Sequence, residues 1–187
     1  MNFVKVSEST FNELVLEAGV ILNTFNPSQV SAPADSAIVC ATTGGINVTC
    51  IPTFTDMGED MDNVMNNSME LKHIDSYDCK FGFTALNVTA EAFKLAIGAA
   101  DISGNKITPR KDLKLTDFKD EIWWVGDVSD GGMVAVCLKN VLSTGGFSLQ
   151  TTKNGKGQIQ FELTGHVSLS AQDEIPMEFY IAKGTQS

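Results

Sequence analysis

Basic residues are scarce in the first part of this sequence. Residues 1–71 contain nine aspartates and glutamates but a single base, Lys5, whereas residues 72–187 contain 14 acidic and 12 basic residues. The formal net charge of −10 is therefore divided into −8 for the first segment and −2 for the second. A chain with this balance lacks the basic patch with which proteins hold nucleic-acid phosphates or anionic membrane surfaces, so both kinds of binding are disfavoured.

Long apolar runs and grouped metal ligands are also absent. No stretch reaches the roughly 18 consecutive apolar residues of a membrane-spanning helix, and the first 17 residues lack the apolar region of a signal peptide. The two histidines, His73 and His166, lie far from any pair of cysteines, so a zinc site is not expected. We expect the cysteines to be buried, reduced thiols of a protein that folds in the cytosol. They are Cys40, Cys50, Cys79 and Cys137.

The sequence contains none of the common catalytic or cofactor motifs. Neither a glycine-rich phosphate loop nor a GxSxG nucleophile motif is present. The acidic run Asp56–Asp62 does not fit a calcium-binding EF-hand loop, because Val64 and Met65 fall on the fifth and sixth positions when the loop begins at Asp60. We therefore expect no catalytic residues, no bound metal and no cofactor.

Apolar residues recur at every second position in several segments, which is the pattern of half-buried β-strands. Odd positions are apolar from Tyr77 to Ala85 and from Ile175 to Ile181, and the same alternation runs from Ile159 to Leu169 with Gly165 as a possible bend. Met133–Val141 is apolar on both faces, which predicts a central strand covered on both sides. The chain is thus expected to fold as a single, mainly β domain over residues 1–187.

One segment, residues 89–100, has the pattern of a helix instead. Thr89 is a candidate N-cap, and Glu91 lies in the first turn, where its charge complements the helix dipole. The apolar residues Phe93, Ala96, Ile97 and Ala100 are expected to share the face that packs on a sheet.

A second unusual segment is Pro52–Glu70, which has no clear period and carries five acidic residues and no base. Loops of this length without secondary structure are uncommon in compact domains, and those that occur are usually functional. We therefore expect a long acidic loop at residues 52–70. Its acidic residues are Asp56, Glu59, Asp60, Asp62 and Glu70.

A series of short motifs follows in order along nearly the whole chain. They are Ala41–Ile46, Asp56–Asn63, Glu70–Lys72, Thr84–Leu86, Gly98–Asp101, Ile107–Arg110, Asp117–Phe118, Ile122–Asp127, Ser143–Ser148 and Thr164–His166. In this order and spacing the chain resembles the major tail proteins, or tail tube proteins, of long-tailed bacteriophages, especially phages of Gram-positive hosts.

The resemblance implies a fold, a function and partners. It implies two antiparallel sheets packed as a sandwich or barrel with one flanking helix, and a structural virion protein without enzymatic activity. Hexameric rings of this protein would stack into the tail tube, through which DNA is ejected without specific binding. The implied partners are further copies of the chain, the tail tip or initiator protein and the tail terminator protein, with assembly in the host cytoplasm and no membrane contact.

The resemblance also assigns roles to two groups of residues. A long loop near the front of the chain would reach an adjacent subunit or ring. In this sequence that loop corresponds to Asp56, Glu59, Asp60, Asp62, Asn63 and Glu70. The polar residues of long alternating strands are the candidates for the inner surface of the tube. They are Gln158, Gln160, Glu162 and Thr164, together with Asp78, Lys80 and Thr84.

Two alternatives remain open at this point. The first is a tube subunit of a contractile tail, a bacteriocin or an injection system, which would have the same fold and a sheath outside it. The second is a β-sandwich module that binds sugar or protein. Its anchor would be Trp123 or Trp124, only one of which could lie on the surface because neighbouring residues of a strand point to opposite faces.

Overall fold

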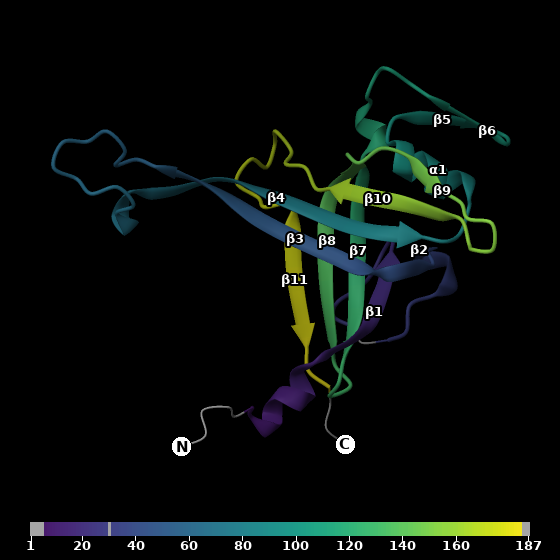
Figure 1. Ribbon diagram of the computed structural model, residues 1–187, viewed down its shortest axis with the longest axis horizontal. Coiled ribbons are helices and arrows are strands. Elements are labelled where there is room, and N and C mark those ends of the chain that lie inside the picture. The colour runs from purple at the N-terminus through teal and green to yellow at the C-terminus, as the bar shows by residue number, and fades with distance from the viewer. Residues whose placement is uncertain (1–5, 30, 185–187) are drawn as a thin grey trace.

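The strands predicted from the alternation pair into two antiparallel layers in the computed structural model (Figure 1), which describes residues 6–29 and 31–184. Lys5, the one base of the acidic first part, lies outside the described residues. The prediction of a mainly β fold with two packed sheets and a flanking helix is confirmed. The two layers are joined where Leu163 and Thr164 of one pair with Ser143 and Leu142 of the other.

The first layer has the spatial order β2, β1, β7, β8 and β11, and the second has the order β10, β4 and β3, with β9 paired to β10. The first-layer strands are β1 (Val15–Leu22), β2 (Ile38–Cys40), β7 (Lys119–Val128), β8 (Met133–Ser143) and β11 (Met177–Ala182). The second-layer strands are β3 (Thr42–Asp56), β4 (Lys72–Ala85), β9 (Ser148–Gln150) and β10 (Gln158–Thr164). A separate hairpin contains β5 (Ala100–Ser103) and β6 (Lys106–Pro109), beside the helix α1 (Ala90–Ile97). Short 3-10 helices cover Glu8–Glu13, Asp35–Ala37, Met69–Leu71 and Leu115–Asp117.

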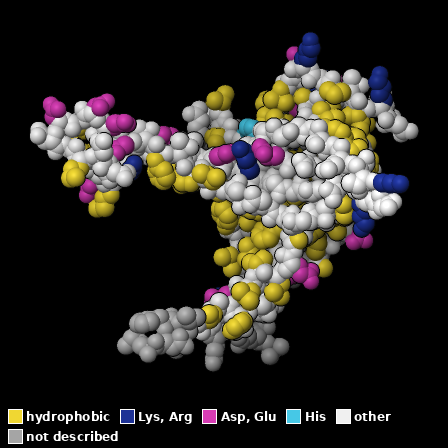
Figure 2. Space-filling model, viewed as in Figure 1, with side chains coloured by type: hydrophobic (Ala, Val, Ile, Leu, Met, Phe, Trp, Pro, Cys, Tyr) yellow, Lys and Arg dark blue, Asp and Glu magenta, His cyan; other side chains and the backbone are white. Residues whose placement is uncertain are grey.

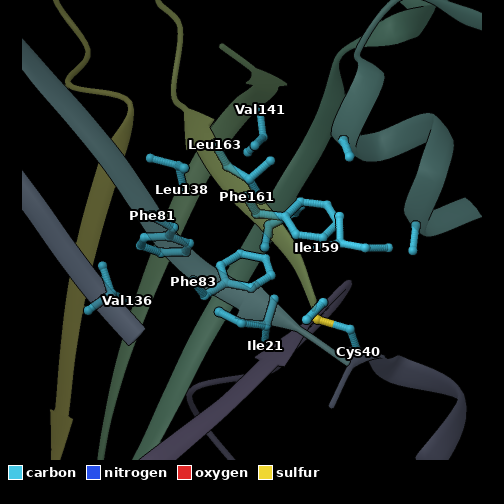
Figure 3. Close-up of a cluster of buried hydrophobic side chains, with 14 of the residues drawn as sticks. Ile21, Cys40, Phe81, Phe83, Val136, Leu138, Val141, Ile159, Phe161 and Leu163 are labelled. Atoms are coloured by element: carbon cyan, nitrogen blue, oxygen red, sulfur yellow. The ribbon is translucent and has the colours of Figure 1, made fainter. Parts of the chain in front are cut away.

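The main hydrophobic core lies between the two layers, where the strands cross (Figure 3). The rings of Phe83 from β4 and Phe161 from β10 stack with centroids 4.8 Å apart and planes 8° from parallel. Phe81 and Leu163 lie beside them, facing Leu138 of β8, and all three are almost fully buried. The odd positions of β4 and β10 therefore form the core face, as their alternation predicts.

A second cluster covers the opposite face of the first layer. Trp123 is only 4% exposed, and its ring lies 5.7 Å from Phe25 and 5.5 Å from Tyr180 between ring centroids. On β8, Ala135 and Cys137 face this cluster while Val136 and Leu138 face the main core. The predicted central strand with two buried faces is thus confirmed.

The predicted helix is present but shorter than expected. The Thr89 side chain accepts a hydrogen bond from the backbone N–H of the third residue after it (3.1 Å), which confirms the predicted N-cap. Gly98 ends the helix with a φ of 82°, a conformation that favours glycine. Ala92 and Ala96 are the buried residues of this helix, and Ala100 already belongs to β5, so the face predicted to include Ala100 is wrong.

The long alternation beginning at Ile159 ends earlier than the sequence suggests. β10 stops at Thr164, and a Cβ atom on Gly165 would lie 2.7 Å from the Leu138 side chain and 3.0 Å from a backbone oxygen. Glycine is therefore required by close packing at this point. Val167 and Leu169 lie beyond it and are exposed, so they do not continue the core face.

In β11 only one of the expected core residues is buried. Met177 is 4% exposed, whereas Phe179 and Ile181 on the same face are 59% and 77% exposed. The reason is that the second layer crosses the first and covers only part of it, so that the far end of β11, an edge strand, stays exposed (Figure 1). The alternation predicts an apolar face correctly, but this face is partly open in a single chain.

Candidate assembly surfaces

The most prominent feature of the molecule is a long hairpin that projects from the body (Figure 1). β3 and β4 stay paired far beyond the core, from Pro52 opposite Tyr77 to Asp56 opposite Lys72. We call residues 51–78 the arm and residues 57–71 its tip. The expected loop at 52–70 is therefore too long at its first end. Pro52 is compatible with strand structure here because β3 is an edge strand, which needs no donor from this residue on its open side.

One face of the arm is apolar and has no partner within the described chain. Residues directly opposite in an antiparallel pair lie on the same face, and Phe54 is opposite Ile74. Phe54 is 54% exposed and Ile74 is 43% exposed. On β3, Phe54 continues the alternation that begins with Cys50, which packs against the main core, and Ile74 lies beside it on β4. The arm thus extends the core face into a region where nothing in residues 6–29 and 31–184 covers it.

The tip is fixed to the arm by Asp56. Its carboxylate accepts hydrogen bonds from the backbone N–H groups of Asn67 (2.6 Å) and Gly58 (3.0 Å), and the Lys72 ammonium lies 3.9 Å away. The hydrogen bond from Asn67, followed by that from Gly58, lowers the pKa of Asp56 below its ordinary value. Asp56, expected as a contact residue, therefore turns inward and holds the tip together.

The other residues expected in the loop contact are exposed on the tip. Asp60 and Asn63 adopt φ values of 65° and 63°, which aspartate and asparagine tolerate better than most residues. Acidic side chains gather over this end of the molecule in Figure 2. The exposed residues of the expected set are Glu59, Asp60, Asp62, Asn63 and Glu70.

Four exposed methionines accompany these acids, at every fourth position of the tip. A methionine side chain is flexible and polarisable, so it adapts to irregular partner surfaces. A spacing of four residues is that of one face of an α-helix, but this segment forms turns, and the sequence-based prediction did not use the spacing. The residues and their exposed fractions are Met57 (61%), Met61 (51%), Met65 (84%) and Met69 (82%).

Removing the Asp56 carboxylate is expected to loosen the tip without unfolding the body. In Asp56→Ala the backbone donors of Gly58 and Asn67 lose their acceptor, so a glutamate-specific protease should cleave at Glu59 several-fold faster, with an unchanged thermal midpoint. Because the pKa is lowered in the folded chain, the carboxylate orders the tip at neutral pH. This effect should be lost as the pH falls through that lowered pKa.

The control is Asp62→Ala, which removes an exposed carboxylate of the same tip. Proteolysis of wild type, Asp56→Ala and Asp62→Ala, followed by mass spectrometry, makes the comparison. Equal cleavage rates in the three proteins would show that Asp56 does not hold the tip.

The expected residues of the inner tube surface lie together on the outer face of the second layer. β10 pairs with β4 so that Gln160 is opposite Thr84 and Thr164 is opposite Lys80, and these residues point away from the core. The neighbouring strand β3 adds small polar residues to this face, such as Asn47. We call it the polar face. It contains all the candidates from both strands: Gln158, Gln160, Glu162, Thr164, Asp78, Lys80 and Thr84.

The charges of the polar face are arranged around one lysine. The Lys80 ammonium lies 2.9 Å from the Asp78 carboxylate and 3.9 Å from that of Glu162. The hydrogen bond to Asp78 is the main cause of a raised Lys80 pKa, so this lysine stays charged. Two carboxylates around one ammonium leave a net charge of −1 on the face.

The arm tip and the polar face are separate surfaces. The five acids of residues 56–71 lie on the projecting arm, whereas the polar face lies on the body and is nearly neutral (Figure 2). The acidic excess of the first 71 residues is therefore concentrated on the arm rather than on the expected inner surface.

The tryptophans considered as a sugar-binding anchor and the four cysteines lie in packed or hydrogen-bonded surroundings. Trp123 is buried, so it offers no platform for a sugar ring; the Trp124 indole N–H donates to the Ala18 carbonyl (3.0 Å). All four cysteines are free thiols, and Cys50 and Cys79 lie with their sulfurs 3.3 Å apart. Burial raises the pKa of the Cys79 thiol to about 12.

The chain was compared with known protein families and with curated proteins, and neither comparison gives a match. Within residues 6–29 and 31–184, no group of three or more potential ligands is arranged to hold a metal ion. No helix in this part of the chain is long and apolar enough to cross a membrane.

Proposed function

We propose that this protein is a structural subunit of a bacteriophage tail tube, which self-assembles into stacked hexameric rings and forms a conduit for DNA ejection. The observation that carries the proposal is the arm. A two-stranded hairpin is at best marginally stable alone in water, and this one also exposes Phe54, Ile74 and a row of methionines. An extension of this kind is expected where another molecule covers it.

The open parts of the body support the same function. β3 and β11 each pair with one strand within the described chain, so each has a free edge that can join a strand of another subunit. Phe179 and Ile181 of β11 present an uncovered apolar face beside such an edge. A closed ring of subunits would cover both kinds of surface, since ring closure removes free edges.

The polar face supports a role as a DNA conduit. Its side chains are mainly hydroxyls and amides, with one lysine paired to two acids. The face therefore offers neutral hydrogen-bonding groups and a net charge of −1 per copy. Six copies would present about six net negative charges per ring. These charges would repel the DNA phosphates weakly, and the face would not bind nucleobases. Such a surface suits passage of DNA better than its retention.

Electron microscopy of the purified protein over a range of concentrations tests the proposal. We expect hollow tubes built from rings of six subunits, with tube length increasing with protein concentration, because a heterologous stacking contact does not close. Monomers at every concentration, or solid fibres without a central channel, would contradict the proposed function. Tubes that require an added sheath protein would favour a contractile tail or an injection system instead.

A further inference from the structure

The end of the molecule opposite the arm is basic. Residues 106–119 contain five bases and two acids, and residues 147–157 contain two bases and no acid, which gives a net charge of +5. These residues belong to β6, the loop after it and the β9–β10 hairpin, which lie away from the arm in Figure 1. Lysine and arginine side chains gather over this end in Figure 2. We call it the basic end.

The loop after β6 is held in place by Arg110. Its guanidinium lies 2.9 Å from Asp101 of β5 and 2.5 Å from Asp117, and it donates to the backbone carbonyl of Asp112 (2.8 Å). Asp117 also accepts from the backbone N–H of Lys114 (2.8 Å). Arg110 thus bridges the two acids that fix the loop, and its own side chain is only 15% exposed.

This loop presents lysine and leucine side chains outward. Lys111 and Lys114 are exposed, and between and beside them Leu113 is 53% exposed and Leu115 is 91% exposed. The exposure of two leucines in a loop that is otherwise anchored leaves an apolar surface that no described part of the chain covers. The basic end therefore alternates positive and apolar groups.

The arm tip has the opposite composition with the same alternation. Residues 56–71 carry five acids and no base, a net charge of −5, and the acids are interspersed with Met57, Met61, Met65 and Met69. A negative apolar surface at one end of the long axis and a positive apolar surface at the other can join only between different molecules, in a head-to-tail arrangement.

We propose that the arm tip of one copy docks on the basic end of another copy, with methionines against Leu113 and Leu115 and with Glu59 and Asp62 against Lys111 and Lys114. This contact rests on the proposed self-assembly and adds the identity of the receiving surface. The methionines and leucines supply the apolar area, and the opposite charges select the receiving surface and its orientation.

Two charge-reversed variants of the full chain test the contact. The first is Glu59→Lys with Asp62→Lys, and the second is Lys111→Glu with Lys114→Glu; all four residues are exposed. Each variant alone places like charges in the contact, so we expect the protein concentration for half-assembly to rise at least about tenfold. An equimolar mixture restores opposite charges at every contact and should assemble as wild type does. Sedimentation velocity measures association, and circular dichroism verifies folding.

The control is Ser170→Glu with Gln172→Glu, compared with the single change Lys114→Glu, which alters the net charge equally. Ser170 and Gln172 are exposed between β10 and β11 and lie in neither surface. We expect normal assembly from the control and weakened assembly from Lys114→Glu, and the loss caused by Lys114→Glu should be smaller in about 1 M salt, where the Debye length falls to about 3 Å.

The outcomes separate this contact from the proposed function. Assembly of both reversed variants at the wild-type concentration, or failure of the mixture to recover although both variants are folded, would overturn the docking. If all charge-reversed variants form hollow tubes at the wild-type concentration, the docking would be overturned and the tube function would stand. Charge-dependent association of wild type into aggregates without a channel would support the docking and contradict the tube function.

Discussion

Replacing the arm tip with a tight turn is expected to abolish assembly and leave a folded monomer. Asp56 and Lys72 are directly opposite in the β3–β4 register, so residues 57–71 can be replaced by Asn-Gly, the usual two-residue turn of a hairpin. The tip contributes no side chain to the core clusters, so the thermal midpoint should change little. Losing the tip acids and methionines should raise the concentration for half-assembly by more than about 100-fold, or roughly 3 kcal/mol.

A matched control removes a comparable exposed segment elsewhere. The turn at residues 169–173 between β10 and β11 is exposed, apart from the half-buried Ala171, and can be shortened without touching either core cluster. We expect this variant to assemble. Sedimentation velocity and near-ultraviolet circular dichroism, which reports on the buried Trp123, measure assembly and folding together. Normal tubes from the tip-deleted chain would show that the arm is not the stacking element.

Neutralising the two acids around Lys80 is expected to convert the polar face into a DNA-binding surface. Asp78→Asn with Glu162→Gln removes both carboxylates that hold the ammonium, and the charge of the face changes from −1 to +1 per copy. Repeated around a ring, these freed lysines should bind duplex DNA electrostatically, with an affinity at least about tenfold above wild type at low salt and a strong decrease as salt is added.

The control is a double variant with the same change of net charge outside the polar face. Asp173→Asn with Glu174→Gln neutralises two exposed acids in the segment between β10 and β11. Fluorescence anisotropy of labelled duplex DNA with assembled protein compares the two variants and wild type. If the Asp78 and Glu162 variant binds DNA no better than the control, then the polar face does not line a passage that DNA can enter.

The alternating strands were predictable because burial imposes a period of two on them. In β4 every odd residue from Cys79 to Ala85 is buried, and the sequence shows this directly. The same period marks Phe179 and Ile181 as one apolar face with Met177, but only contact with the second layer decides which of them is covered. A period identifies an apolar face; it does not identify the molecule that covers it.

The residues expected to line the tube lie together in the structure because they too follow the period of two. The even positions of β4 and β10 share the outer face because the two strands are paired, and residues of one parity in paired strands lie side by side. The strand from Pro52 to Asp56 was not predicted, since a proline lies within it and Phe54 alone is too little to establish a strand period. The role of Asp56 depends on a contact with Asn67, eleven residues later, which no local pattern records.

The basic end was not recognised from the sequence because its charges come from separate segments. Lys111 and Lys114 are separated from Lys153 and Lys156 by β7, β8 and β9, and each pair alone is unremarkable among surface lysines. Folding places their segments at one end of the molecule, opposite the acidic arm. The uneven distribution of charge along the sequence thus gives the folded chain one acidic end, the arm, and one basic end.

Cryo-electron microscopy of the assembled protein, at a resolution that shows side chains, tests the central claim most directly. The account predicts a hollow tube in which Gln160, Glu162 and Lys80 line the channel and each arm tip lies on the basic end of another copy. A tube with these residues on its outside, or an assembly without a channel, would contradict it.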